Sequence, residues 1–544
     1  MIFSARQVQE KCIEQQIPLY QVFVDLTKAF DTVNREALWK ILGKLGCPPT
    51  FVHMFKELHR NMKARVTFNG QLSEEISIDN GVKQGDIPAP TLFSIFFAVL
   101  LTHAFEDVDV GILLRFRTSG KVFNLRRFNI KSKVFQALIR ELLYADDADF
   151  LAHSEADMQI IMDNFSRACV AFGLTISLKK TKVMFTPAPG EPYIEPNIMV
   201  NGTRLEVVDT FVYLGSTLSR DGALDAEVYA RIQKAAVAFG KLEKRVWADR
   251  DISINTKLEV YRTCVITVLL YAAETWTTLQ KHIKVLEHFH LKCLRRVLSI
   301  KWQTFTPDTV VLQKADCPNM ESLIVAQQLR WAGHLVRMGD DRIPKQLFYG
   351  ELVRGKRPRH KPRKRYKDTL KNAMRGADID YSNWEELALD RAEWRKTVKQ
   401  GCKSIHHRRI ERAELKRDLR KGKTANLPCG FSHWTCETCG RTLLSKAGYV
   451  NHLKSHRHNS PTANLPPQPD STTCAICSKV CKSIPGLKRH MAVHKDELKH
   501  PDIINPVQNL SFVCHLCHRP CKSAAGLRSH LRAHAREVET IEEQ

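Results

Sequence analysis

Three aspartates in the N-terminal half of the sequence have the residue type and setting for metal chemistry. Asp25 follows the apolar residues 22–24, and Asp146 and Asp147 are adjacent between apolar stretches, the pattern of a tight hairpin with both acids at its turn. Neighbouring carboxylates repel one another and are costly to bury, so water or a divalent cation must neutralise them. Three carboxylates suit two Mg²⁺ ions, which about 3.5–4 Å apart can activate a 3′-hydroxyl and stabilise a leaving pyrophosphate. Each acid taken alone is explained as well by a solvated turn or an ordinary strand end.

The C-terminal region repeats one metal-ligand spacing three times. Each copy reads Cys-x2-Cys-x12-His-x3-His, which supplies two thiolates and two imidazoles to a closed tetrahedral zinc site. Chance explains three copies of one spacing poorly, so we predict three structural Zn²⁺ ions in three ββα modules. The expected ligands are Cys436, Cys439, His452 and His456; Cys474, Cys477, His490 and His494; and Cys514, Cys517, His530 and His534.

Short strands and amphipathic helices must position the three aspartates. β-Branched and aromatic runs predict strands at residues 19–26, 64–69 and 207–214, and apolar residues at helical spacing predict helices at 35–45 and 157–173. From residue 221 the apolar residues recur every three or four positions, which predicts a helical region through about residue 337. We therefore expect an α+β fold over the first 220 residues and helices beyond it.

The charge balance favours a polyanionic partner. The 544 residues include 83 Lys and Arg against 58 Asp and Glu, a net charge of +25. Residues 354–367 hold nine basic residues and no acid, and Pro358 and Pro362 prevent a regular helix. We expect an extended basic tether that contacts nucleic-acid phosphates and could also serve nuclear import, although a solvated linker has the same composition. The predicted contact residues are Arg357, Arg359, Arg363, Lys364 and Arg365.

Length and hydropathy exclude some classes of protein. A chain of 544 residues is expected to hold several domains. No apolar run reaches the roughly 18 residues that cross a bilayer, and the first residues lack the pattern of a secretory signal. We therefore expect an intracellular protein with reduced thiols and no membrane partner.

Five short motifs in the first 220 residues follow one another in an order that resembles a known family. They are FVDLTKAFD at residues 23–31, GVKQG at 81–85, YADD at 144–147, FGL at 172–174 with KKTK at 179–182, and FVYLG at 211–215. Together they resemble the palm motifs of non-LTR (LINE-type) retrotransposon reverse transcriptases. The likeness continues weakly through residues 270–276 and 329–338, so that it covers residues 6 to about 370.

The resemblance implies a role for each matching residue. Asp25, Asp146 and Asp147 would be catalytic and would hold the two Mg²⁺ ions. The nucleotide site would be formed by Phe30 under the incoming sugar, by Gln84 and Gly85 at the pocket, and by Lys180 or Lys182 as the proton donor to pyrophosphate. The turn that positions the primer end would be Tyr213, Leu214 and Gly215.

The resemblance also implies an order of domains. We expect a palm at residues 1–220, a helical thumb and post-polymerase region at 221–345, a basic linker and helix at 346–428, and zinc fingers at 429–458, 472–496 and 512–536. The family's fingers subdomain, which precedes the first aspartate motif, has no room before Asp25, so the chain reads as N-terminally truncated. An extra Pro88 after Gln84-Gly85 also departs from the family pattern.

Two functions of different classes follow from these features. The first is RNA-directed DNA synthesis with an RNA template, a DNA primer and dNTP, residual or lost in a truncated chain. The alternative is a non-catalytic nucleic-acid-binding protein derived from a retrotransposon, in which the zinc fingers and the basic stretch bind DNA or RNA. The intact aspartates favour the first function and the missing fingers subdomain favours the second. Either function places the chain in the nucleus, and the sequence does not predict its oligomeric state.

Overall fold

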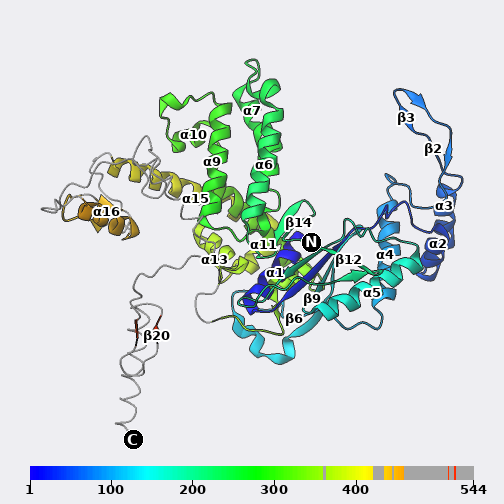
Figure 1. The fold of residues 1–544 in the computed structure, drawn as a ribbon. Coiled ribbons are helices and arrows are strands. Elements are labelled where there is room, and N and C mark those ends of the chain that lie inside the picture. Colours follow the sequence, from blue (N-terminus) through cyan, green and yellow to red (C-terminus); the bar gives the residue numbers. More distant parts are fainter. Residues whose placement is uncertain are drawn as a thin grey trace, which may run out of the picture. The chain divides into compact units, whose positions relative to one another are not determined.

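The computed structural model describes residues 1–358, 363–420, 434–440, 442–443, 446–458, 512–513 and 520–521 (Figure 1). The chain divides into two compact units. One comprises residues 1–435 with 440–445, and the other comprises residues 436–439 with 446–544. Among the described residues, no helix combines the length and the apolar character that a membrane crossing requires.

A five-stranded sheet forms the centre of the first unit. Its strand order is β13 (Glu206–Val207), β10 (Lys182–Thr186), β1 (Leu19–Val24), β9 (Asp147–Ala152) and β8 (Glu141–Tyr144). The middle strand β1 is antiparallel to both of its neighbours, so its backbone is bonded along both edges. All but one of its residues are buried, which explains why the sequence is an apolar run.

Helices cover both faces of this sheet, and alternate residues of β1 face opposite sides. Val22 and Val24 join a core with α4 (Ala89–Phe105) and α5 (Glu155–Phe172), whereas Leu19 and Phe23 join a core with α1 (Ile2–Gln15). Figure 1 shows α4 and α5 side by side next to the sheet, in agreement with their close packing. Strand β1, which leads to Asp25, is therefore packed between helices on both faces of the sheet.

The predicted helices of this part are confirmed, and two of the predicted strands are divided. α2 (Arg35–Lys44) begins at Asn34, whose side chain accepts a hydrogen bond from the Ala37 amide. The stretch 64–69 forms two short strands rather than one, because its first half pairs with β5 (Ile76–Ser77) and its second half with β4 (Gln71–Leu72) across a turn. The stretch 207–214 is likewise split between β13 and β14. The bounds of these remaining elements are α3 Pro49–His59, β2 Lys63–Ala64, β3 Thr67–Phe68, β14 Thr210–Tyr213 and β15 Ser216–Ser219.

Smaller sheets flank the central one. β6 (Ile112–Phe116) lies between β7 (Phe135–Ile139) and β16 (Glu351–Leu352), so a strand from far along the chain completes this sheet. β11 (Met199–Val200) and β12 (Thr203–Arg204) form a hairpin that contacts α5.

The helical region expected after residue 221 is present and has a core of its own. The apolar stripe predicted from residue 224 lies on α6 (Asp225–Lys241) and the π-helical turn that follows it. In Figure 1, α6 and α9 (Gln280–Val297) run side by side. The other helices are α7 Ile254–Tyr261, α8 Thr267–Leu269, α10 Asp308–Lys314 and α11 Met320–Arg337.

The residues after 345 continue this compact unit instead of leaving it. α13 (Tyr366–Gly376), α14 (Trp384–Leu389) and α15 (Arg391–Arg420) share a hydrophobic core with α11 and with α12 (Ile343–Tyr349). The expectation of a free basic tether is wrong for residues 363–367, because these residues are packed and bonded within the unit. The helix expected within residues 346–428 is present as α15, which continues to Arg420.

The second unit contains the helix of the first zinc module, α16 (Lys446–His458). Two short hairpins are also described, β17 (Trp434–Thr435) with β18 (Thr442–Leu443) and β19 (Phe512–Val513) with β20 (Pro520–Cys521). The predicted ligands of the second and third zinc modules, Cys474, Cys477, His490, His494, Cys514, Cys517, His530 and His534, lie outside the described residues.

Candidate active site and zinc centre

The register of two central strands brings the first and second acidic motifs together. Val24 of β1 lies opposite Ala148 of β9 in an antiparallel pair. The next residue of one strand therefore lies opposite the preceding residue of the other, which places Asp25 across from Asp147. The two side chains point to the same face of the sheet as Phe23, because residues two apart on a strand share a face.

The third aspartate lies in the turn that joins β8 to β9. Tyr144 and Asp147 pair across the hairpin, so its two-residue loop is Ala145 and Asp146. Ala145 has a φ of 54°, a left-handed conformation that alanine rarely adopts and that tight turns require. The sequence predicted Asp146 and Asp147 together at the turn, but Asp147 is the first residue of the strand. The structure brings all three predicted aspartates to one end of the sheet.

The electrostatics of this end fit a bound cation. Burial raises the pKa of the Asp147 carboxyl, and the negative charges of Asp146 and Asp25 raise it further. The Nζ atom of Lys180 lies 3.1 Å from Oδ2 of Asp25 and is the cation nearest to the cluster. Three half-buried carboxylates gathered at one end of the sheet favour a divalent cation, whose charge offsets their repulsion. Among the described residues, the ligand atoms already grouped closely enough to hold a metal are those of the first zinc module, so a metal at the acidic cluster would have to draw the three aspartate side chains closer together.

The residues predicted to line the nucleotide pocket adjoin Asp25 through the loop that follows it. Phe30 is half-buried and stacks on Phe93 of α4, with ring centroids 4.4 Å apart. Gln84 donates a hydrogen bond from Nε2 to Oδ1 of Asp31 over 3.1 Å, which ties the second motif to the end of the first. Gly85 has a φ of 95°, a conformation open to glycine and strained for other residues.

The predicted primer-positioning turn is a tight hairpin turn. Leu214 and Gly215, with φ values of 47° and 79°, join β14 to β15. The hydroxyl of Tyr213 donates a hydrogen bond to the carbonyl of Leu142 over 3.3 Å, so the turn is anchored on the strand that leads to Asp146.

The sequence did not predict the ion pair that holds this turn. Glu227 and Arg231 of α6 are fully or almost fully buried and lie 2.8 Å apart. Arg231 donates to the carbonyl of Gly215, and Glu227 accepts a hydrogen bond from the amide of Thr217. Their spacing of four residues on one helix face was the available signal, but the same spacing is common in solvated pairs.

The first zinc module has the geometry of a metal site. Its four predicted ligand atoms, from Cys436, Cys439, His452 and His456, all lie within 4.8 Å of one another. Sγ of Cys439 is 3.1 Å from Nε2 of His452, and Sγ of Cys436 is 3.3 Å from Nε2 of His456. Separations of this size suit ligand atoms placed about 2.0–2.3 Å from a central Zn²⁺ ion.

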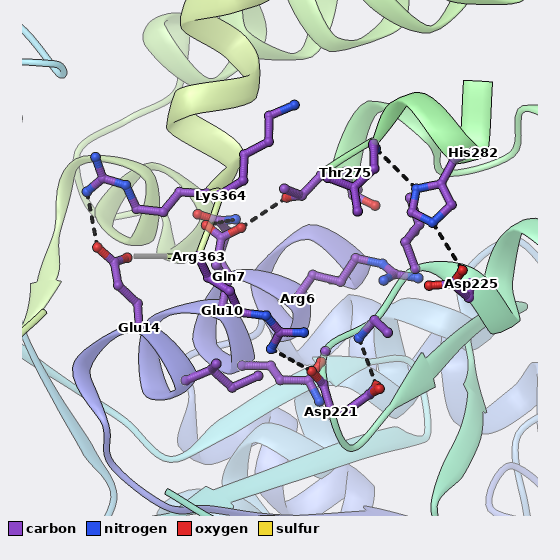
Figure 2. Close-up of a pocket in the computed structure, with 18 of the residues that line it drawn as sticks. Arg6, Gln7, Glu10, Glu14, Asp221, Asp225, Thr275, His282, Arg363 and Lys364 are labelled. Carbon is purple, nitrogen blue, oxygen red and sulfur yellow. Dashed lines mark hydrogen bonds and ion pairs between the residues drawn. The ribbon is translucent and has the colours of Figure 1, made fainter. Parts of the chain in front are cut away.

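The basic residues predicted to contact nucleic acid have partners inside the first unit. Arg357 and Arg365 both lie 3.1 Å from Oε1 of Glu14, and both also lie near Asp368. A pocket of about 410 Å³ lies between α1 and the start of α9. Figure 2 shows Glu14, Arg363 and Lys364 at this pocket. Arg363 donates to the carbonyl of Asp221 and Lys364 to that of Thr278. Arg359 lies outside the described residues.

Comparison with family models identifies two regions of the chain. Residues 4–218, which contain all three aspartates, match the model described as reverse transcriptase (RNA-dependent DNA polymerase). Residues 434–458 and 512–535 match a zinc-finger of C2H2 type. The predicted second module at 472–496 is not among the matched segments and stays a prediction.

The similar proteins are products of mobile elements. An uncharacterized transposon-derived protein of Caenorhabditis elegans is 24% identical over 274 residues, which are 47% of this chain and 94% of that protein. The RNA-directed DNA polymerase from mobile element jockey of Drosophila funebris is 24% identical over 53% of this chain, and a Pol polyprotein from retrotransposable element R2 of Popillia japonica is 25% identical over 38%. The matched regions span only 29% and 32% of these two longer proteins.

Solved structures give a weaker likeness. The structure of apo telomerase from Candida tropicalis aligns with 65% of this chain and 56% of that chain at 11% identity. Its TM-score of 0.29 is too low to carry an argument. By the family model and the relatives together, residues 4–218 match a reverse transcriptase domain whose relatives include proteins of non-LTR retrotransposons, and C2H2 zinc-finger sequence follows in the same chain.

Proposed function

We propose that this chain carries out RNA-directed DNA synthesis, with Asp25, Asp146 and Asp147 as the ligands of the catalytic divalent cations. The observation that supports the proposal is the strand register that sets Asp25 opposite Asp147, with Asp146 in the adjoining turn. Divalent cations at this position would activate the primer 3′-hydroxyl and neutralise the charge on the leaving pyrophosphate. The three aspartates would hold two Mg²⁺ ions.

The remaining residues of the site would bind and orient the substrates. The half-buried ring of Phe30 would lie under the sugar of the incoming dNTP, and Gln84 with Gly85 would border its pocket. Lys180, exposed and 3.1 Å from Asp25, would contact the phosphates and donate a proton to pyrophosphate. The turn at Leu214 and Gly215 would support the primer end.

In this proposal the sheet with its covering helices is the palm of the polymerase, and the helices from α6 onward are its thumb. The buried pair of Glu227 and Arg231 would keep the primer-positioning turn fixed to the first thumb helix. The zinc modules would bind three Zn²⁺ ions in all and would contact DNA or RNA. A nuclear location follows from a function on genomic DNA.

Primer extension on an RNA template tests the assignment of the aspartates. We expect extension that depends on Mg²⁺ or Mn²⁺ and falls to background in Asp146→Asn, because the amide removes one anionic metal ligand while leaving the shape nearly unchanged. Asp149→Asn is the matched control, since Asp149 lies on β9 two residues after Asp147, is fully buried and is not a proposed ligand. Extension that survives Asp146→Asn and not Asp149→Asn would contradict the assignment.

A further inference from the structure

One motif of the sequence has no part in the proposed active site. Residues 329–338 form the last turns of α11, and Arg330, His334 and Arg337 occupy positions i, i+4 and i+7 of this helix. Residues at this spacing lie on one helix face. The buried residues of the same segment, Leu329 and Ala332 among them, face the hydrophobic core, so the basic face points away from that core.

A close helix crossing brings two more arginines to this face. Gly333 of α11 lies against the indole of Trp394 of α15, and a Cβ atom at position 333 would come within 2.2 Å of the indole Nε1. The same Nε1 donates a hydrogen bond to the carbonyl of Leu329 over 3.0 Å. Glycine at 333 therefore permits a contact that fixes α15 against the end of α11.

The residues on either side of Trp394 complete a cluster of cations. Arg391 and Arg395 are four apart on α15; both charges act on Arg337 across the crossing, and that of Arg391 also acts on His334. Burial lowers the pKa of Arg337, and repulsion from Arg391 and Arg395 lowers it further. We name the five residues Arg330, His334, Arg337, Arg391 and Arg395 the α11–α15 basic surface.

This surface differs from the basic stretch at 357–365 in having no acid partner. In the part of the chain that the structure describes, no carboxylate forms an ion pair with any of its four arginines. The two nearest acids in sequence are engaged elsewhere, since Asp390 caps the amides of Ala392 and Glu393, and Glu393 pairs with Lys396. Arg337 donates to the carbonyl of Ala388, which fixes its side chain without neutralising its charge.

We propose that the α11–α15 basic surface binds the phosphate backbone of a nucleic acid. Arg330, Arg391 and Arg395 are exposed, and a guanidinium can donate two parallel hydrogen bonds to one phosphate. Bound phosphates would offset the mutual repulsion that the helix crossing imposes on the cluster. The choice of a nucleic acid as the partner rests on the proposed function. The residues of the surface, however, lie in the helical region and are not among the proposed catalytic groups.

Nucleic acid is favoured over an acidic protein by the regularity of the surface. Its basic residues, His334 included, follow two helix faces at one-turn spacing, which suits the evenly spaced charges of a polynucleotide backbone. Contacts of this kind would be independent of base sequence, because phosphates carry no sequence information.

Salt-dependent binding tests the proposal with a triple variant of the three exposed arginines, Arg330→Gln, Arg391→Gln and Arg395→Gln. The probes are a labelled 20-base-pair DNA duplex of arbitrary sequence and an RNA hairpin of equal length. On duplex DNA each lost phosphate contact lowers the slope of log K against log salt by about 0.9, so three lost contacts lower it by about 2.7. We expect this loss with at least a tenfold weaker affinity at about 0.1 M salt, on one probe or on both.

The matched control removes three basic charges that already have acid partners. Arg204, Lys396 and Arg408 are exposed and lie 3.0, 3.8 and 3.1 Å from Glu195, Glu393 and Asp378. Their replacement by Gln changes the net charge of the chain equally and should leave the salt slope within about 0.5 of wild type. Equal losses in both triple variants, or no loss in the first, would overturn the proposal.

Two further features of the experiment distinguish a loss of phosphate contacts from misfolding and from a failure of the proposed function. Replacing the same three arginines by Lys keeps the charges and should restore most of the salt slope; a slope as low as that of the Gln variant would overturn the proposal. All binding is measured in the Asp146→Asn background, so that a chain without polymerase activity still gives a readable result. A loss on the RNA probe alone identifies the template as the partner, and a loss on the duplex alone identifies DNA.

Discussion

Asp149 of β9 accepts a hydrogen bond from the side-chain amide of Gln21 of β1 over 3.3 Å, with both side chains buried. Both residues lie on the same sheet face as Asp25 and Asp147, with Asp149 two residues after Asp147 and Gln21 four residues before Asp25. Burial raises the pKa of Asp149 well above its usual range, which favours the neutral acid, whereas the hydrogen bond from Gln21 favours the carboxylate. Strand β9 thus carries one acid at its end, Asp147, which is placed to bind a metal, and one buried acid, Asp149, which belongs to the protein interior.

Asp149 is predicted to be replaceable by its amide and not by a smaller residue. Asp149→Asn keeps an acceptor for Gln21 and should change the free energy of unfolding by less than about 1 kcal/mol, whereas Asp149→Ala leaves a buried amide without its partner and should cost about 1–3 kcal/mol. Urea denaturation at pH 6 measures both values. Equal destabilisation by the two variants would show that the hydrogen bond to Gln21 is not what matters there.

Gly333 is predicted to resist replacement by alanine. An added methyl group would meet the Trp394 indole, so Gly333→Ala should destabilise the protein by about 1–3 kcal/mol through overpacking. Gly240 is the matched control, because it also lies in a helix and has no atom within 4 Å of an added Cβ. There the substitution should stabilise by about 0.5–1 kcal/mol, as helix propensity alone predicts. Thermal unfolding of the two variants should therefore shift in opposite directions.

Glu10 is predicted to make stability fall with rising pH. Burial raises the pKa of this carboxyl to about 7, although Tyr366 and Thr277 both donate hydrogen bonds to it. Because the folded-state pKa lies above the unfolded one, the favourable contribution is full below about pH 4.5 and is lost as the pH rises through about 7. Glu10→Gln should remove this slope and exceed the wild-type stability at pH 8 by at most about 3 kcal/mol. Denaturation at pH 5 and pH 8 gives the comparison, and parallel pH profiles would contradict it.

The first zinc module is predicted to lose its metal and its fold together. In Cys436→Ser the bound zinc should fall by one ion per chain, because a hydroxyl does not replace a thiolate ligand. A module this small depends on the ion for its folding, so chelation should unfold residues 434–458 while the first unit keeps its thermal transition. Elemental analysis and circular dichroism measure the two effects. Unchanged zinc content in Cys436→Ser would remove Cys436 from the ligand set.

The part of the fold that could be predicted from the sequence depends on local signals. Helix α5 begins at Ser154, whose hydroxyl caps the Asp157 amide, and ends at Gly173 in a left-handed conformation, as the sequence of that stretch indicates. The strand before Asp25 and the hairpin around Asp146 carry equally local apolar patterns. The placement of the three aspartates followed from these elements and from the family resemblance.

The part that could not be predicted depends on contacts between distant residues. The basic stretch has no acid within its own sequence, and one of its two acid partners, Glu14, lies about 350 positions away, so composition alone indicated a tether. The α11–α15 basic surface likewise depends on a glycine and a tryptophan on separate helices, whose contact leaves no periodic pattern. Sequence periodicity records which face of a helix is buried but not which helix covers it.

The contacts of α1 with residues 350–367 bear on how the chain acquires its structure. Lys11 donates to the carbonyl of Gly350, Glu10 accepts from the Tyr366 amide, and Glu14 pairs with Arg365. These contacts join residues more than 330 positions apart, so the first helix emerges from the ribosome long before its partners are synthesised. At about 5–20 residues per second that interval lasts tens of seconds. During this time the side of α1 that contacts residues 350–367 has no cover there, so this part of the first unit forms only after residue 367 has been synthesised.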